Sequence, residues 1–162
     1  MLKVGDTAPP IDAVGSDGKR FVLYGQDSLC TVIYFFPKAF TPHCTAETHE
    51  FRKHYVELEL AGATLVGVST DDSDTQCRFA TKMGAPFPIL GDKDRSICRA
   101  YDVLWPVIGI AHRVTYLVAP AQAGPACTVE AIFHHEFDVG AHRDEVLRSV
   151  DAKFRARQAS RS

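Results

Sequence analysis

The sequence predicts an α/β domain in which helices cover both faces of a central mixed β-sheet. Two continuous runs of β-branched and aromatic residues, Cys30–Phe36 and Ala63–Val68, have the composition of strands that are buried on both faces. A segment with helical features follows each run, and two further strands and a last amphipathic helix come later in the chain. With 162 residues, 46% of them hydrophobic, the chain can bury one core without disulfides or metals, so we expect a single domain over 1–162.

The elements before the first buried strand are expected to be short. Gly5–Lys19 is rich in Gly, Pro, Asp and Ser, a composition that predicts turns and brief extended pieces ahead of Phe21–Tyr24. The buried strand Cys30–Phe36 then ends at Pro37, which has no N–H to donate to a sheet.

A long helix is predicted after this strand. Thr41 suits the N-cap and Pro42 the first helical position, where its missing N–H has no cost, and the helix is expected to run to about Leu60. Its inward positions recur at the 3–4 spacing of one helix face. They are Thr48, Phe51, Tyr55 and Leu58. Cys44 precedes the first of them by four residues, so we expect it to point inward from the first turn.

The second half of the chain repeats the strand–helix alternation and then changes to a hairpin. Candidate N-caps at 71–74 begin a helix that runs through Met83 and stops at Gly84. The later elements are a strand at 87–90, a short helix at 95–101, hairpin strands at 113–118 and 127–134, and a helix at 141–154 with Val146, Leu147 and Val150 inward. Residues 155–162 are expected to form a frayed basic tail. This order of elements fits a thioredoxin-like architecture.

Composition argues against several classes of function. The 18 Lys plus Arg against 20 Asp plus Glu give a net charge of −2, which offers no broad basic surface for nucleic acid or an anionic membrane. No window approaches the roughly 18 apolar residues of a membrane span, and the N-terminal residues lack the apolar region of a signal peptide, so we expect a cytoplasmic protein. The cysteines are odd in number and without CxxC pairing, which argues against a disulfide framework or a zinc ribbon. They are Cys30, Cys44, Cys77, Cys98 and Cys127.

Cys44 has the clearest chemical setting of the five. With Thr41 as N-cap, Cys44 is the third residue of the helix, where free backbone N–H groups and the positive end of the helix dipole favour an anion. A thiolate is such an anion, and it is the nucleophilic form of cysteine. The Thr41 hydroxyl, on the same turn, can donate to the sulfur or to an oxygen bound beside it. The segment therefore suits a site that reduces an oxidant, although Thr41 as a simple cap and Cys44 as core packing are the alternative.

The segment around Cys44 also resembles the peroxiredoxin signature. Pro37-x-x-x-Thr41-x-x-Cys44 follows a buried strand, and the fuller string FPKAFTPHCTAE, which ends at Glu47, is similar to the PrxQ or bacterioferritin comigratory protein subfamily. Further segments match in the family's order, so the resemblance covers roughly the whole chain. They are Val4–Pro9, Leu65–Ser69 and Arg113–Val118. The resemblance implies a thioredoxin-like fold and a thiol-dependent peroxidase that reduces hydrogen peroxide and organic hydroperoxides, with no metal or organic cofactor.

The resemblance gives five residues a role. Cys44 is similar to the peroxidatic cysteine, whose thiolate attacks a peroxide oxygen and becomes a sulfenic acid. Arg113 is similar to the active-site arginine, which holds the sulfur ionised and stabilises charge on the departing oxygen. Thr41 is expected to hydrogen-bond the peroxide, and Pro37 to shield the sulfur from water. Glu47 is expected to orient Arg113, although a glutamate in a first helical turn also suits the helix dipole.

One position departs from the family pattern. Many PrxQ proteins place a resolving cysteine five residues after the peroxidatic one, where this chain has His49. A second PrxQ variant carries it in the helix after the next strand, which is the place of Cys77, so the resemblance implies a Cys44–Cys77 disulfide. Forming it would require local unwinding, because both thiols start in helices. A one-cysteine cycle completed by an external thiol stays open, and the resemblance implies a monomer that is recycled by thioredoxin or a similar thiol reductant.

The remaining cysteines and histidines are given no chemical role. Cys30, Cys98 and Cys127 are expected to pack in the core. His43, which replaces the family's usual glycine, is left without an assignment. A metal site is not favoured, because ligands on one helix face are four residues apart whereas His49 and His54 differ by five. The histidines considered for it are His43, His49, His54, His134 and His135.

Two other functions are alternatives to the peroxidase activity. Disulfide exchange of the thioredoxin type uses two cysteines two residues apart, and Cys44 has no such neighbour. A redox-sensing or holdase-type binding protein on the same fold stays open, because fold alone does not decide function.

Overall fold

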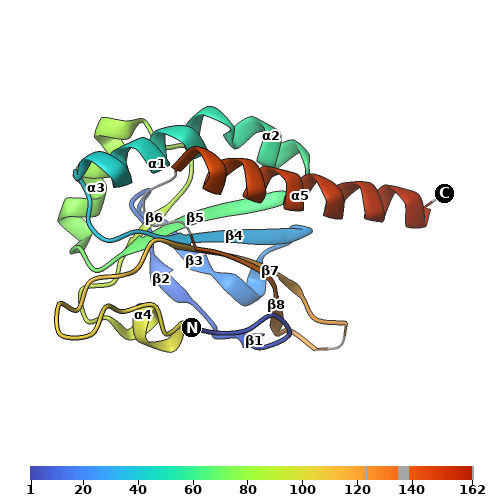
Figure 1. The fold of residues 1–162 in the computed structure, drawn as a ribbon, viewed down its shortest axis with the longest axis horizontal. Coiled ribbons are helices and arrows are strands. Elements are labelled where there is room, and N and C mark those ends of the chain that lie inside the picture. Colours follow the sequence, from blue (N-terminus) through green and yellow to red (C-terminus); the bar gives the residue numbers. More distant parts are fainter. Residues whose placement is uncertain (123, 135–138, 162) are drawn as a thin grey trace.

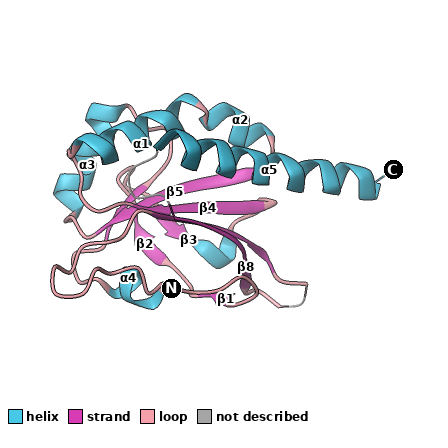
Figure 2. Cartoon of the chain, in the orientation of Figure 1, coloured by secondary structure: helices cyan, strands magenta, loops and turns pink. Residues whose placement is uncertain are grey.

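The computed structural model, which describes residues 1–122, 124–134 and 139–161, is built on a six-stranded mixed sheet (Figures 1 and 2). The strand order is β1-β8-β7-β4-β5-β6. The strands are β1 (Thr7–Ala8), β4 (Cys30–Phe35), β5 (Ala63–Ser69), β6 (Ile89–Gly91), β7 (Val114–Pro120) and β8 (Cys127–His134). The β4–β5 and β5–β6 pairs are parallel, while β4–β7, β7–β8 and β8–β1 are antiparallel. The mixed sheet predicted from the sequence is therefore confirmed.

Helices cover both faces of this sheet, as predicted. The long helices lie together on one side of the sheet (Figure 1), with one apolar cluster packed beneath them and a second on the opposite face. The helices of the first face are α1 (Pro42–Lys53), α2 (Tyr55–Leu60), α3 (Ser73–Met83) and α5 (Val139–Arg161). The second face carries the short α4 (Ser96–Ala100), the 3₁₀ turn η1 (Leu23–Gly25) and the hairpin of β2 (Asp12–Val14) and β3 (Arg20–Val22).

The central strand β4 is buried on both faces. Val32 and Tyr34 belong to the cluster under the long helices, whereas Ile33 and Phe35 belong to the opposite one, and all four are 0% exposed. The Tyr34 ring lies over Gly67 of the neighbouring strand β5, where a Cβ atom would come within 2.6 Å of the ring. The absence of a side chain at Gly67 thus makes room for an aromatic ring beneath α1.

The helix that carries Cys44 begins where the sequence indicates and ends earlier. Thr41 is the N-cap and Pro42 the first residue of α1, but the helix stops at Lys53 and α2 starts after His54. The backbone of His54 leaves the helical region (φ −103°, ψ 10°), and its Nδ1 lies 3.0 Å from Glu57 Oε1 in the first turn of α2. One continuous helix to Leu60 was therefore wrong. The inward face is as predicted, with Thr48, Phe51 and Leu58 buried and Tyr55 half-buried.

Other segments differ from the prediction in their ends. The extended run expected at 21–24 turns into η1 from Leu23 onward, and the strand expected at 87–90 lies at Ile89–Gly91. The last helix α5 continues to Arg161, so the segment from 155, expected to fray, is helical in the structure. Arg155 Nε lies 3.1 Å from Asp151 Oδ2, and such a pair one turn apart favours helix. None of the helices within the described ranges combines the length and apolar composition needed to cross a membrane.

Candidate active site

Arg113 joins Cys44 and Glu47 in a buried cluster. Its Nη2 donates to Cys44 Sγ at 3.3 Å, and its Nη1 donates to Glu47 Oε1 at 2.9 Å. Cys44 and Glu47 are each 1% exposed and Arg113 is 3% exposed. Cys44 and Glu47 come from the first two turns of α1, and Arg113 directly precedes β7, which pairs with β4. The sheet therefore brings together the three residues expected from the sequence.

The electrostatics of the cluster keep Arg113 charged. Burial alone lowers the pKa of Arg113, but the charges of Glu47 and Cys44 and the hydrogen bonds to both outweigh it and raise that pKa above its ordinary value. A permanent cation 3.3 Å from the sulfur attracts a thiolate, and its planar fork leaves no freedom to turn away from either partner. The site can thus hold a nucleophilic sulfur beside a donor that is already positioned.

Thr41 and Pro37 belong to the loop between β4 and α1. Thr41 caps the helix without a side-chain cap bond, and its hydroxyl donates instead to the Lys38 carbonyl at 2.7 Å. In this structure the hydroxyl is therefore not directed at the sulfur, as the sequence had suggested it could be. Pro37 is half-buried at the start of the loop, and its shielding of the sulfur stays a prediction.

Cys77 lies apart from this cluster. It is exposed on α3, and its Sγ donates to the Ser16 carbonyl at 3.7 Å. Cys44 is buried and Cys77 exposed, and both are free thiols in this structure. The structure does not bring the two expected partners together.

The other cysteines pack in the core, as predicted. Cys30 is 1% exposed, Cys98 0% and Cys127 6%. Burial raises the pKa of the Cys30 thiol to about 11, and it also raises the pKa of Cys98 and of Cys127. These three residues are therefore neutral thiols at physiological pH.

The histidines near Cys44 in the sequence lie on the surface or between carboxylates. His43 and His49 are exposed, and His54 lies between Glu50 and Glu57. Across the described residues, no group of three or more His, Cys, Asp or Glu side chains is arranged to hold a metal ion. His135, one of the ligands considered from the sequence, lies outside those residues.

Sequence reasoning did not find the role of Asp71. The four residues 71–74 were equivalent as N-caps, but Asp72 caps α3 by accepting from Thr75 N at 2.7 Å. Asp71 instead accepts from the backbone N–H of Ala39, in the loop that precedes Cys44, at 2.8 Å. The sequence does contain one indication of this contact. Pro37 and Asp71 each follow a buried strand, and the ends of two such strands lie side by side when the strands are parallel neighbours.

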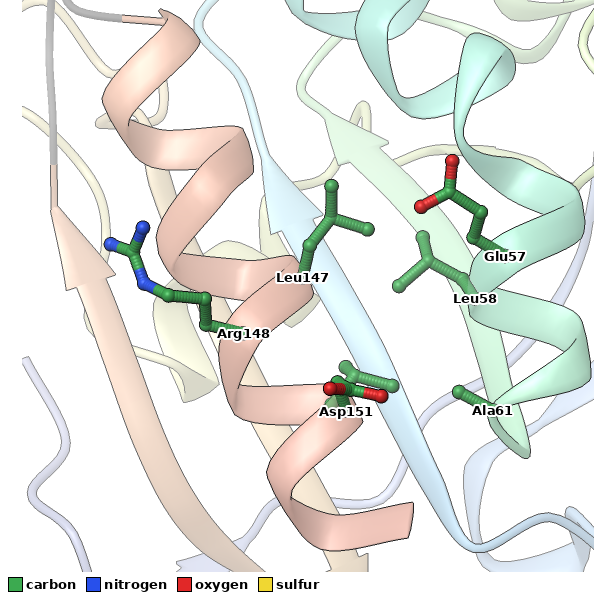
Figure 3. A pocket seen from close by; sticks show the side chains of 7 residues that line it. Glu57, Leu58, Ala61, Leu147, Arg148 and Asp151 are labelled. Carbon is green, nitrogen blue, oxygen red and sulfur yellow. The ribbon is translucent and has the colours of Figure 1, made fainter. Parts of the chain in front are cut away.

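A cavity of about 350 Å³ lies away from this cluster, between α2 and α5 (Figure 3). Leu58 and Leu147 point toward each other across it, and its lining also includes the charged residues Glu57, Arg148 and Asp151. It includes none of the residues that surround Cys44, so it takes no part in their chemistry.

Comparison with known proteins places this geometry in a family. The AhpC/TSA family model matches residues 4–123. The chain is 31% identical over 152 residues to peroxiredoxin Bcp of Escherichia coli K12, covering 90% of this chain and 94% of the relative. Among solved structures, peroxidoxin BcpB from Mycobacterium tuberculosis superimposes with a TM-score of 0.83 at 27% identity, covering 94% of this chain and 98% of the other. The bacterioferritin comigratory protein of Xanthomonas campestris gives 0.78 at 30% identity, with 89% and 92% covered.

A thioredoxin-like sheet on which a cysteine in the first turn of a helix is buried against an arginine is the arrangement of the thiol peroxidase class. The expected thioredoxin-like fold is thus confirmed. Within that class, the chain belongs to the AhpC/TSA family, and its relatives are peroxiredoxins of the Bcp or PrxQ type.

Proposed function

We propose that the chain reduces hydroperoxides through Cys44 and completes the cycle with Cys77. The observation that carries the proposal is the Arg113 guanidinium, which donates at once to Cys44 Sγ and to Glu47. The Cys44 thiolate attacks the terminal oxygen of the hydroperoxide, and the O–O bond breaks. The sulfur loses two electrons and becomes a sulfenic acid, while the alkoxide or hydroxide takes a proton and leaves as alcohol or water.

Each of the four residues proposed to assist Cys44 has a separate role in this step. Arg113 stabilises the charge that develops on the departing oxygen, and Glu47 holds the guanidinium in the orientation that serves both sulfur and oxygen. We propose that the Thr41 hydroxyl turns from the Lys38 carbonyl, to which it donates in this structure, toward the bound peroxide, and that Pro37 keeps water from the sulfur. Both belong to the loop that leads into the Cys44 turn, which supports these two roles.

The substrates we propose are hydrogen peroxide and organic hydroperoxides. The structural relative from Xanthomonas campestris is described by its alkyl peroxide reduction activity, which supports the organic part of this range.

Cys77 is proposed as the resolving cysteine. Its thiolate attacks the sulfur of the Cys44 sulfenic acid, the S–O bond breaks, water leaves and a disulfide forms. Because Cys44 is 1% exposed and Cys77 lies on the surface of α3, the first turn of α1 must unwind before the sulfurs meet. A dithiol reductant such as thioredoxin then returns both thiols. We propose that the protein works as a cytoplasmic monomer, and an external thiol in place of Cys77 is the alternative.

Mass mapping of cysteines after one equivalent of hydrogen peroxide tests this cycle. Reduced wild type is expected to yield a Cys44–Cys77 disulfide, and Cys77→Ser to stop at the sulfenic or sulfinic acid of Cys44. Cys44→Ser is the control and should consume no peroxide. Oxidation of Cys44 without an internal disulfide would replace Cys77 with an external thiol, and an inert Cys44 would refute the proposed function.

A further inference from the structure

We propose that Asp71 is a positioning residue, which fixes the loop before Cys44 to the start of the helix that carries Cys77. This inference rests on the proposed function, since the loop's position matters to the reaction only if Cys44 reacts with peroxide. It concerns residues outside the cluster of Cys44, Glu47 and Arg113.

The first link is made by the Asp71 carboxylate. Its Oδ2 accepts from the backbone N–H of Ala39 at 2.8 Å and from the Ser69 hydroxyl at 2.5 Å. Ala39 is 5% exposed and Ser69 is fully buried, so both donors are largely removed from water. Hydrogen bonds from buried donors to a carboxylate are among the stronger ones in proteins. The carboxylate therefore ties the loop to the end of β5.

The second link continues from Ser69 into α3. The Gln76 side chain donates to Ser69 Oγ at 2.7 Å and to the Leu90 carbonyl at 2.9 Å, and it is 1% exposed. Gln76 directly precedes Cys77 in the chain. A continuous path of hydrogen bonds thus joins the loop before Cys44 to the first turns of the Cys77 helix.

Phe40 attaches the same loop to α3 at a second point. Its backbone has φ +67°, a left-handed conformation that is unfavourable for a residue with a large side chain. Its ring packs edge-on against Phe79 at a centroid distance of 5.2 Å, and Lys82 Nζ lies 5.7 Å from the ring centre. Both partners belong to α3. The surroundings therefore hold the loop in a conformation that Phe40 would not adopt alone.

The attached loop sets the start of α1. Thr41, the N-cap, follows Phe40 directly and donates its hydroxyl to Lys38 within the same loop. A shift of the loop therefore displaces the N-cap and the first helical turn, including Cys44, while Arg113 keeps its place next to β7. Misplacement of a reacting group by about 1 Å costs on the order of a hundredfold in rate. Asp71 thus acts on the reaction through the loop, without touching the sulfur.

The test compares Asp71→Ala with Asp71→Asn and with Asp72→Ala. Asp72 is the matched control, because it is the next acidic residue and caps α3 without contacting the loop. The measurements are the second-order rate constant of Cys44 oxidation by hydrogen peroxide and deuterium uptake by peptides covering 38–47 and 73–77. Asp71→Ala should lower the rate constant roughly tenfold or more and raise uptake in both peptides. Asp71→Asn, whose amide oxygen can still accept from Ala39, should restore most of the rate.

The control separates positioning from general destabilisation. Asp72→Ala should raise uptake in 73–77 alone and keep the rate constant within about twofold of wild type. Phe40→Ala serves as a second variant, because it removes the other attachment of the loop to α3 at a side chain that is 44% exposed, and it should raise uptake in 38–47 and lower the rate constant. Wild-type rates and uptake in Asp71→Ala and Phe40→Ala, or an equal loss in Asp72→Ala, would overturn the inference. If wild-type Cys44 does not react with peroxide, the proposed function fails, and the uptake of 38–47 still decides whether Asp71 holds the loop.

Discussion

Arg113 is buried between a sulfur and a carboxylate, and a lone cation would be strongly destabilised in such a place. Its two partners lie on the same helix face, three residues apart, so one planar guanidinium can reach both. We therefore expect charge alone to be insufficient at this position, because the guanidinium presents its donors in one rigid plane, whereas an ammonium carries rotating donors on a flexible chain.

The substitution Arg113→Lys keeps the positive charge but removes the planar guanidinium that donates to both Cys44 and Glu47. The second-order rate constant for hydrogen peroxide should fall by roughly a hundredfold, the loss typical of removing one positioned donor to a developing oxyanion. The measurement is competition kinetics against a peroxidase of known rate. Arg78→Lys, an exposed arginine on α3, is the matched control and should be unchanged. A variant Arg113→Lys as fast as wild type would show that the fork has no role.

Local sequence rules predict the position of Cys44 but not the long-range contacts of the residues around it. Cys44 at a helix start was predictable, because Thr41 and Pro42 are strong start signals. The contact of Arg113 with Glu47 spans 66 residues and depends on the pairing of β7 with β4, so only the family resemblance indicated it. The assignment of Asp71 to the loop depends equally on which strands are neighbours, which the four acidic and serine residues at 71–74 do not reveal.

At the scale of elements, α1 is held to the sheet by a polar contact beneath Cys44. Tyr34 of β4 and Thr48 of α1 share a hydrogen bond of 3.2 Å between their hydroxyls, and both side chains are fully buried. Burial raises the pKa of Tyr34 well above its ordinary value, with a smaller opposing effect from Thr48, so the phenol stays protonated and able to donate. The bond attaches the second turn of α1 to β4.

Thr48→Val is expected to destabilise the fold, because the isosteric side chain leaves the buried Tyr34 hydroxyl without its partner. The free energy of unfolding should fall by about 1–3 kcal/mol, measured by urea denaturation of the reduced protein. Thr45→Val, on the same helix but half-buried, is the control and should change it by much less. Equal effects of the two substitutions would contradict a specific contribution from this bond.

The elements themselves were predicted well where hydrophobic periodicity is strong. The strands β4 and β5, the start of α1 and both ends of α3 follow from buried runs, a Thr-Pro start and a Gly stop. The break at His54 and the extension of α5 to Arg161 were missed. The first depends on one backbone conformation, and the second on charged residues that stabilise a helix without any apolar pattern.

Across the whole molecule, several buried thiols and phenols make the stability of the fold depend on pH in the same direction. The pKa of Cys30 is raised by burial to about 11, that of Tyr116 to about 12, and those of Cys98 and Tyr101 are raised as well. Each group keeps its proton in the folded protein at a pH where the unfolded chain has lost it. Since the folded state then binds more protons, the free energy of unfolding falls as the pH rises.

The protein is therefore expected to lose stability as the pH approaches and passes 9, starting with the thiols, whose ordinary pKa is 9.0. Urea denaturation of the reduced protein at pH 7.5, 9 and 10.5 measures this, and the midpoint should fall at each step. A midpoint that rises or stays constant across this range would contradict the burial of these groups as the cause.

The surroundings of the five thiols, rather than burial alone, favour reaction at one of them. Among the five cysteines only Cys44 combines a helix start with a cationic donor, while the others are core residues or, for Cys77, exposed without a cation in contact among the described interactions. Cys44 Sγ is therefore expected to be the first atom that peroxide oxidises.

Trapping the sulfenic acid in Cys77→Ser tests this claim most directly. The reduced variant is treated with less than one equivalent of hydrogen peroxide in the presence of a dione reagent that alkylates sulfenic acids, and the adduct is located by peptide mass mapping. We predict a single adduct on Cys44, which is lost when Arg113 is also replaced by Met. An adduct on Cys30, Cys98 or Cys127, or peroxide consumption with Cys44 unmodified, would contradict the account.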